Sequence, residues 1–158
     1  PGSQASYTFH GRDVYAYTGA RLAAGLIQFE NVGPLLNDDL VRIPFRAAEL
    51  RDQTLKGTID IIDVQYGNLW SNIPEKLIRQ LQIKEGDMLD VTISENGKPK
   101  YSGKIKFGNT FSDVAKGEPV AYLNSLMNLS FAINLGNFVT STGTGSGPEW
   151  TVSVRRVR

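Results

Sequence analysis

Cysteine is absent from the 158-residue sequence, which excludes disulfide bonds, thiol nucleophiles and thiolate metal ligands. There is a single histidine, so a zinc site of the usual spacing and a Ser-His-Asp triad both lack support. No apolar run approaches the roughly 20 residues that a membrane-spanning helix requires. Basic and acidic residues nearly balance, 17 against 16, which gives no general attraction to nucleic acid or to an anionic membrane. We therefore expect no metal ion, no nucleic acid and no membrane among the partners of this chain.

No signal peptide is evident either, and a chain without cysteine is compatible with the cytosol, so a cytoplasmic location is expected. Because the first residue is Pro1 and not methionine, we expect that the native beginning has been lost or cut. What the sequence does contain is 41% hydrophobic and 21% charged residues, the composition of a globular chain with one core of ordinary size.

Three parts are predicted along the chain. Residues 1–28 carry a lead-in and a short helix, because Asp13 supplies an acidic first turn and Gly25 a glycine stop. Residues 29–56 are interpreted as a linker with one short strand around Val41 to Phe45. Residues 57–158 hold short β-rich runs separated by glycine, asparagine or proline, which predicts a small barrel or sandwich. The runs are Thr58 to Val64, Met88 to Ser94, Gly103 to Phe107, Val120 to Leu123, Leu129 to Ile133 and Trp150 to Val154.

Three local patterns refine this β-rich part. A short helix is expected from about Ser71 to Leu81, with an early Pro74, and we expect it to plug one end of the barrel. The pair Asn96-Gly97 favours a tight hairpin turn in which both residues adopt positive φ. The glycines from Gly143 to Gly147 suggest a phosphate loop, but Pro148 and a strand follow where a helix is needed, so a flexible hairpin loop is expected.

The only histidine, His10, lies beside Gly11 at the start of the first predicted helix. Most lone histidines are structural or simply exposed. At a helix start next to glycine, however, the side chain can face a cleft, where it could accept a proton from water.

A second group of candidates follows the strand that ends near Ile62. Asp63 and Asn68 could cap a turn, with Tyr66 and Trp70 filling the core. The same side chains could instead form a pocket for a planar heterocycle, because an amide offers a donor and an acceptor while aromatic rings offer faces for stacking.

Two further positions share this ambiguity. Phe111 could supply another stacking face, and Asn124-Ser125 could either form a turn or bind a carboxylate.

Taken together, three stretches of the chain resemble the S-adenosyl-L-methionine (SAM) hydroxide adenosyltransferase family, to which fluorinase and chlorinase are related. They are Thr8 to Ala16, Ile62 to Ile73, and Tyr122 to Ser125 with Ala132 to Asn137. The resemblance covers nearly the whole chain in order. It implies an enzyme with an N-terminal α/β domain and a C-terminal antiparallel β-barrel, assembled as a homotrimer with active sites between neighbouring subunits.

Under this resemblance the chain is a mainly β, C-terminal portion of such an enzyme. Residues 1–28 correspond to the last helix of the α/β domain, residues 29–56 to the linker and residues 57–158 to the barrel. The rest of the α/β domain is expected before Pro1.

The resemblance implies that water displaces methionine at the ribose C5′ of SAM, giving adenosine and L-methionine, with SAM as the substrate and no cofactor. In the family an Asp, Arg and His triad handles the water, and His10 matches the histidine. The Asp, the Arg and a ribose-binding aspartate are expected upstream of Pro1, so this chain alone is expected to be inactive. Gly11 falls where the fluorinating relatives have a halide-binding serine, which favours water as the nucleophile.

The resemblance also implies substrate contacts. Asp63 matches the residue that receives the methionine ammonium, and Asn68 matches the amide that reads adenine. Three residues match aromatics around the nucleoside: Tyr66, Trp70 and Phe111. Ser125 corresponds to a contact with the methionine carboxylate, and the backbone at Ile133 and Leu135 to contacts with the adenine edge.

Two positions depart from the family pattern. Met127 stands where the family's Asn-Ser-x-Gly pattern has glycine, and Leu126 lacks the charge that an arginine gives some relatives next to Ser125.

Two other classes of function stay open at this stage. One is a noncatalytic β-barrel that binds adenosine or an adenine nucleotide, or that stacks single strands on Tyr66, Trp70 and Phe111, although the balanced charge argues against nucleic acid. The other is an assembly element, because an isolated helix and a long connector expose apolar surface.

Overall fold

The computed structural model describes residues 8–37, 40–42 and 45–157. The chain divides into two compact units, one within residues 1–43 and one within residues 44–158. Each unit is described by itself. No helix among the described residues is long and apolar enough to cross a membrane.

The first unit contains the predicted helix. It begins with a π-helical segment η2 (Gly11–Ala16), continues as α1 (Tyr17–Ala23), and is followed by a single 3₁₀ turn η3 (Phe29–Asn31). The helix stop at Gly25 is confirmed, because this residue adopts φ +67°. Its N–H donates to Leu22 O and the N–H of Leu26 donates to Arg21 O, the paired bonds of a Schellman motif.

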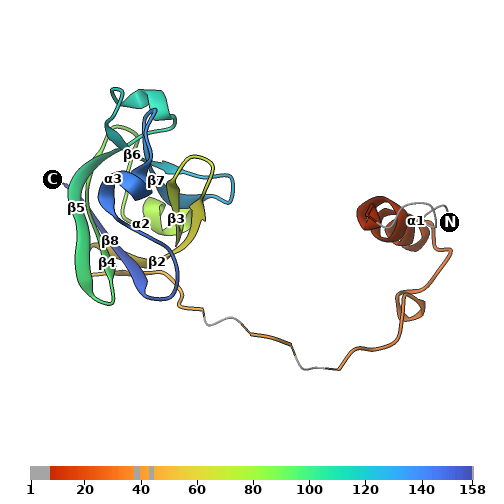
Figure 1. Cartoon of the computed structure of the whole chain (residues 1–158). Coiled ribbons are helices and arrows are strands. Elements are labelled where there is room, and N and C mark those ends of the chain that lie inside the picture. The colour runs from red at the N-terminus through yellow and green to blue at the C-terminus, as the bar shows by residue number, and fades with distance from the viewer. Residues whose placement is uncertain (1–7, 38–39, 43–44, 158) are drawn as a thin grey trace. The chain divides into compact units, whose positions relative to one another are not determined.

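The second unit is a closed β-barrel, which confirms the expected mainly β fold class (Figure 1). In its described residues the strand order is β1-β2-β3-β7-β6-β5-β4-β8, and a further pairing of β8 with β2 closes the sheet into a ring of seven strands. The strands are β1 (Glu49–Arg51), β2 (Thr54–Asp63), β3 (Asn68–Pro74), β4 (Met88–Glu95), β5 (Lys98–Phe107), β6 (Pro119–Leu123), β7 (Asn128–Ile133) and β8 (Trp150–Arg156). Neighbouring strands run antiparallel except β5 and β6, which are parallel.

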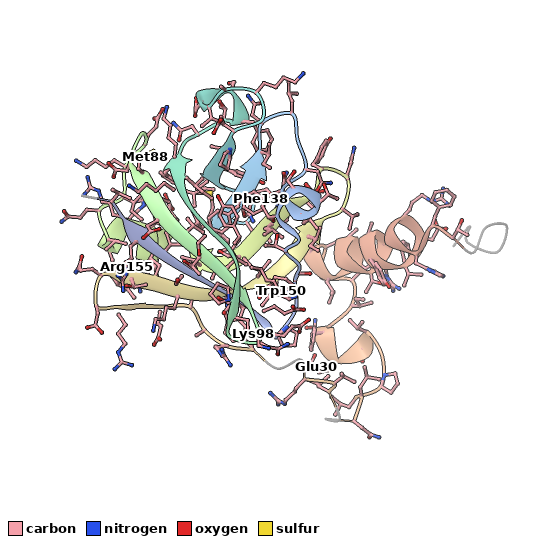
Figure 2. All side chains as sticks on the ribbon, turned by 60° about the vertical axis from the view of Figure 1, so that its left-hand side comes forward. Glu30, Met88, Lys98, Phe138, Trp150 and Arg155 are labelled. Carbon is pink, nitrogen blue, oxygen red and sulfur yellow. The ribbon has the colours of Figure 1, made fainter. Side chains whose placement is uncertain are left out.

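The interior of the barrel is packed by side chains that alternate along the strands, as the period of a strand requires. Two short helices contribute to this core: α2 (Glu75–Gln80) through Ile78 and α3 (Phe138–Thr142) through Phe138. The ring of Phe138 is fully buried, meets Tyr101 edge-on at 5.1 Å and is labelled in Figure 2. Complete burial of such a ring stabilises the fold by about 1.5–3 kcal/mol, so α3 is firmly anchored to the strands.

The strand expected around Val41 to Phe45 is not found at its described residues, while residues 43–44 lie outside the described part. The short strand of this region is β1, which comes later and pairs Leu50 with Leu55 of β2. Asp52 and Gln53 form the hairpin turn between them, both at positive φ. Because Asp-Gln is not a typical pair for such a turn, the sequence pattern did not reveal it. β1 and the first residues of β2 thus lie within the segment interpreted as a linker.

A second difference concerns the segment before α2. Asn68–Pro74 forms strand β3, so the helix begins at Glu75 and not near Ser71. Side chains alternate along β3, with Leu69, Ser71 and Ile73 buried, and the Ser71 hydroxyl donates to Leu129 O of β7 at 2.6 Å. The polar residues that looked like a helix cap therefore belong to a strand whose partner is distant in sequence.

The two expected glycine turns had different outcomes. The hairpin at Asn96-Gly97 is confirmed, with φ values of +48° and +76°. The prediction of a hairpin loop from Gly143 to Gly147 is wrong, because this segment joins helix α3 to β8 and not two strands. Gly143 ends the helix in the left-handed conformation. A Cβ on Gly145 would approach the Trp150 indole to 2.8 Å, so part of this loop is closely packed.

Candidate functional site

A row of three residues crosses the outer face of the barrel. Trp70 of β3 lies opposite Ser130 of β7, which in turn lies opposite Tyr122 of β6. Their chain neighbours Leu69, Phe131 and Ala121 form the next row, and that row belongs to the buried core. Because successive residues of a strand point to opposite faces, Trp70, Ser130 and Tyr122 lie on the outside of the barrel.

Polar side chains on this outer face are unusually well buried. Asn68 is 4% exposed, Asn124 is 5% exposed and Ser130 is fully buried. Asn124 Nδ2 donates to Ser130 Oγ at 3.0 Å, while its Oδ1 accepts from the N–H groups of Leu126 and Asn128. Buried polar groups are costly unless they are hydrogen-bonded. The hydrogen bonds of Asn124 and Ser130 offset that cost on this face.

The centre of the face is a cluster of four side chains from three strands: Asp63, Asn68, Trp70 and Tyr122. Asp63 and Asn68 are opposite each other where β2 and β3 meet. Burial raises the pKa of the Tyr122 hydroxyl, the nearby polar side chains of Trp70 and Asn68 oppose this rise, and the negative charge of Asp63 adds to it. Asp63, Asn68 and Trp70 are thus the side chains that influence the tyrosine hydroxyl.

The indole N–H of Trp70 is the unsatisfied group of this cluster. Its Nε1 atom is buried and has no hydrogen-bond partner within the usual distance limits, although it lies close enough to the Tyr122 hydroxyl to lower the pKa of that group. It is the one such buried side-chain atom in the described part of the chain. An unpaired buried donor costs about 1–3 kcal/mol.

The turn that joins β2 to β3 carries Tyr66 at its tip. Asp63 O accepts from the N–H groups of Tyr66 and Gly67, at 3.1 and 2.7 Å, and Gly67 adopts φ +70°. Gly67 therefore supplies the positive φ of this turn. The Tyr66 ring is 57% exposed, so it does not fill the core.

Phe111 is presented by a rigid loop between β5 and β6. The single 3₁₀ turn η4 (Phe111–Asp113) is held by a capping box between Thr110 and Asp113. The Phe111 ring meets Tyr122 edge-on at a centroid distance of 5.0 Å and remains 44% exposed. Hydrogen bonds from the backbone N–H groups of Thr110 and Asn109 hold the pKa of the Asp113 carboxyl below its usual value.

Ser125, Ile133 and Leu135 lie in two other turns of the barrel unit. Ser125 is exposed in the turn after β6 that Asn124 organises. Ile133 ends β7, and Gly136 N–H donates back to its carbonyl at 3.0 Å. Between them Leu135 is 80% exposed and adopts φ +53°.

His10 belongs to the other unit, where it precedes η2 and its side chain is exposed. The structure thus brings Asp63, Asn68, Trp70 and Phe111 together around Tyr122. Among residues 8–37, 40–42 and 45–157 no group of three or more histidine, aspartate or glutamate side chains is placed to hold a metal ion.

Comparison with known proteins identifies the family of this barrel. The model of the SAM hydroxide adenosyltransferase C-terminal domain matches residues 57–151, more than half of the chain. The chain belongs to the SAM hydroxide adenosyltransferase family. This finding confirms the resemblance inferred from the three sequence stretches.

Individual relatives of this family member carry two different names. A fluorinase of Nocardia brasiliensis is 35% identical over 150 residues, which cover 93% of this chain and 48% of the relative. An (R)-S-adenosyl-L-methionine hydrolase of Thermus thermophilus is 31% identical over 141 residues, covering 89% of this chain and 47% of the relative. The chain spans about half the length of the curated relatives it matches.

A solved structure has the same fold. The crystal structure of an uncharacterized conserved protein from Thermotoga maritima superimposes with a TM-score of 0.70 at 28% identity, covering 96% of this chain and 54% of the other. This similarity supports the fold described above.

In this member of the SAM hydroxide adenosyltransferase family, Tyr122 is the site candidate that sequence reasoning missed. Tyr122 begins the stretch Tyr122 to Ser125, but its place in the cluster depends on the register that aligns β6 with β7 and β7 with β3. In the strand, Tyr122 alternates with Ala121 and Leu123, which belong to the core or pack against it.

Met127 is the position where this family member departs from the expected glycine. It adopts φ +59°, the left-handed conformation that glycine enters without cost. Asn124 holds Met127 in this strained conformation, because it fixes the turn through its side chain and its carbonyl.

Proposed function

We propose that this chain forms the C-terminal half of the substrate site of a SAM hydrolase, which converts SAM and water to adenosine and L-methionine. The observation that carries the proposal is the buried polar cluster on the outside of the barrel, with its unsatisfied Trp70 Nε1. Nothing in a barrel's own packing requires Asn68 to be buried on an outer face, whereas a nucleoside ligand would use it.

The proposed ligand contacts follow from the chemistry of each side chain. The Asn68 carboxamide pairs with the donor and acceptor of the adenine edge, aided by the backbone at Ile133 and Leu135. Tyr66, Trp70 and Phe111 provide aromatic faces around the nucleoside, and Tyr122 meets the ring of Phe111 and is influenced by Trp70. Asp63 attracts the methionine ammonium, and the Ser125 hydroxyl donates to the methionine carboxylate.

The proposed reaction is a single displacement. A water oxygen forms a bond to C5′ while the C5′–S bond breaks, and its electron pair stays on the methionine sulfur. The proton lost by the water is accepted by His10 and passes to solvent. Since the sulfonium is a good leaving group, orienting and partly desolvating the water accounts for most of the catalysis.

The proposal includes an assembly, expected to be a homotrimer, in which another subunit covers this face. Six large apolar side chains around the cluster and its neighbouring turns are at least 44% exposed in the isolated chain: Ile61, Tyr66, Phe111, Leu126, Met127 and Leu135. These side chains come from separate elements of the barrel unit. Contact with another protein surface would remove their apolar atoms from water. A cytoplasmic location belongs to the same proposal.

The decisive assay incubates the gene product that contains this chain with SAM in halide-free buffer and quantifies adenosine and methionine by liquid chromatography. Equal amounts of both products support hydrolysis. A parallel reaction with fluoride or chloride tests the alternative that the fluorinase relatives raise: a halogenated nucleoside would identify halide as the nucleophile. Gly11, which has no hydroxyl to bind a halide, favours water.

Calorimetric titration of adenosine into the chain itself separates binding from catalysis. Binding that is weakened by Asn68→Ala, with no turnover by the complete gene product, would favour the noncatalytic adenosine-binding module. Absence of both binding and turnover would contradict both functions.

A further inference from the structure

The side chain of Asn137 lies between two turns that the proposed function uses. It is the N-cap of α3, where its Oδ1 accepts the N–H of Thr140 at 2.9 Å. The next residue, Phe138, is fully buried in the core, so this helix start is fixed to the barrel.

The same carboxamide occupies the space where Gly67 lacks a side chain. A Cβ on Gly67 would lie only 2.1–2.2 Å from the Cγ, Oδ1 and Nδ2 atoms of Asn137. The N–H of Val139 also donates to Gly67 O at 3.1 Å. The tip of the β2–β3 turn is therefore held from one side by its own strands and from the other by the first turn of α3.

Residues assigned to substrate binding flank both ends of this contact. On one side Tyr66 and Asn68 are the immediate neighbours of Gly67. On the other side Leu135 precedes Asn137 by two residues in the turn that begins at Ile133.

We propose that Asn137 is a positioning residue that couples these two turns and so fixes Asn68 relative to the backbone at Ile133 and Leu135. This inference rests on the proposed function, because it assigns the two turns to the same adenine ring. Asn137 itself does not contact the substrate. It acts by filling the space above Gly67 while its oxygen caps the helix.

Three substitutions separate the two roles of the side chain. Asn137→Asp keeps both the shape and the capping oxygen. Asn137→Ser keeps an oxygen that can cap α3 but removes the planar group that packs on Gly67. Asn137→Ala removes both, and its stability loss from the lost cap serves as the reference.

The first measurement uses ligand-free, isotope-labelled protein. We expect Asn137→Ser to melt near the wild type, yet to shift and broaden the side-chain amide signal of Asn68 and the indole N–H signal of Trp70. Asn137→Asp should restore both signals. Wild-type signals in Asn137→Ser would overturn the proposal, because the contact with Gly67 would then position nothing.

The second measurement is calorimetric titration with adenosine. In Asn137→Ser the β2–β3 turn is no longer held against α3, so the Asn68 side chain must be ordered when adenosine binds. This cost should weaken binding by about 2- to 10-fold. Unchanged affinity in this variant would also overturn the proposal. If wild-type protein fails to bind adenosine at all, the proposed function fails, whereas the ligand-free spectra still decide whether Asn137 positions Asn68.

Discussion

Replacing Gly67 by alanine should destabilise the barrel by about 3 kcal/mol, well beyond the usual cost of a side chain in a glycine turn. Two physical effects add. Gly67 has φ +70°, a conformation that costs an L-residue about 1–2 kcal/mol, partly offset by the lower entropy of alanine in the unfolded chain. The new Cβ would also lie 2.1 Å from Asn137, so that side chain must move.

The second effect can be estimated from the bonds that Asn137 and its helix would lose. Displacing the N-cap costs about 1 kcal/mol, and weakening the Val139 N–H bond to Gly67 O costs about 1 kcal/mol more. For a chain of this length, about 3 kcal/mol corresponds to a fall of roughly 6–12 °C in the melting temperature.

Gly97→Ala is the matched control. Gly97 has φ +76°, close to that of Gly67, but a Cβ there would meet nothing within 4 Å. It should therefore show the backbone cost alone, about 1 kcal/mol or roughly 2–4 °C. Thermal melts followed by circular dichroism would compare the two variants, and equal falls in melting temperature would refute the reasoning. The double variant with Asn137→Ala should lose less than the sum of its single changes, since the clash is then absent.

Three other changes test the site and its loops. In the complete gene product, His10→Ala should lower kcat by about 100-fold or more while KM stays within a few-fold, since proton transfer by a placed side chain contributes that much; unchanged kcat would remove His10 from the mechanism. Asn68→Ala should weaken adenosine binding by about 1–3 kcal/mol in calorimetry, whereas the exposed Asn109→Ala, outside the cluster, should leave it unchanged. Because the pKa of Asp113 is lowered in the fold, its contribution to stability is present above its unfolded pKa of about 4 and is lost as the pH falls through the folded value. Between pH 5 and pH 2 the melting temperature should thus fall less steeply in Asp113→Asn than in the wild type. Identical slopes would contradict a stabilising role of the hydrogen bonds to the Asp113 carboxylate.

Features that a short segment determines by itself were predictable from the sequence. The hairpin at Asn96-Gly97 and the helix stop at Gly25 both depend on glycine reaching positive φ, and both are present. Most strands of the barrel were found because apolar β-formers alternate within a few residues.

Features that depend on distant partners were not predictable. Strand β3 looked like a helix start because it contains Asn72 and Pro74, and only its pairing with β2 and β7 makes it a strand. Tyr122 reaches the site for the same reason, since the register of three strands brings it toward Trp70. The turn at Asp52-Gln53 escaped notice because two residues other than glycine adopt positive φ there.

The parallel pairing of β5 with β6 has a consequence for how proteins with this barrel can diversify. Parallel neighbours cannot be joined by a tight turn, so the chain between Phe107 and Pro119 forms a longer loop. Lys106 Nζ and Asn134 Nδ2 fasten it through the carbonyls of Asp113 and Val114. Lengthening such a loop costs only about 0.6 kcal/mol per doubling, and no strand has to change its partner. Insertions and deletions around Phe111 can therefore reshape this face while the hydrogen-bonded ring of strands stays intact.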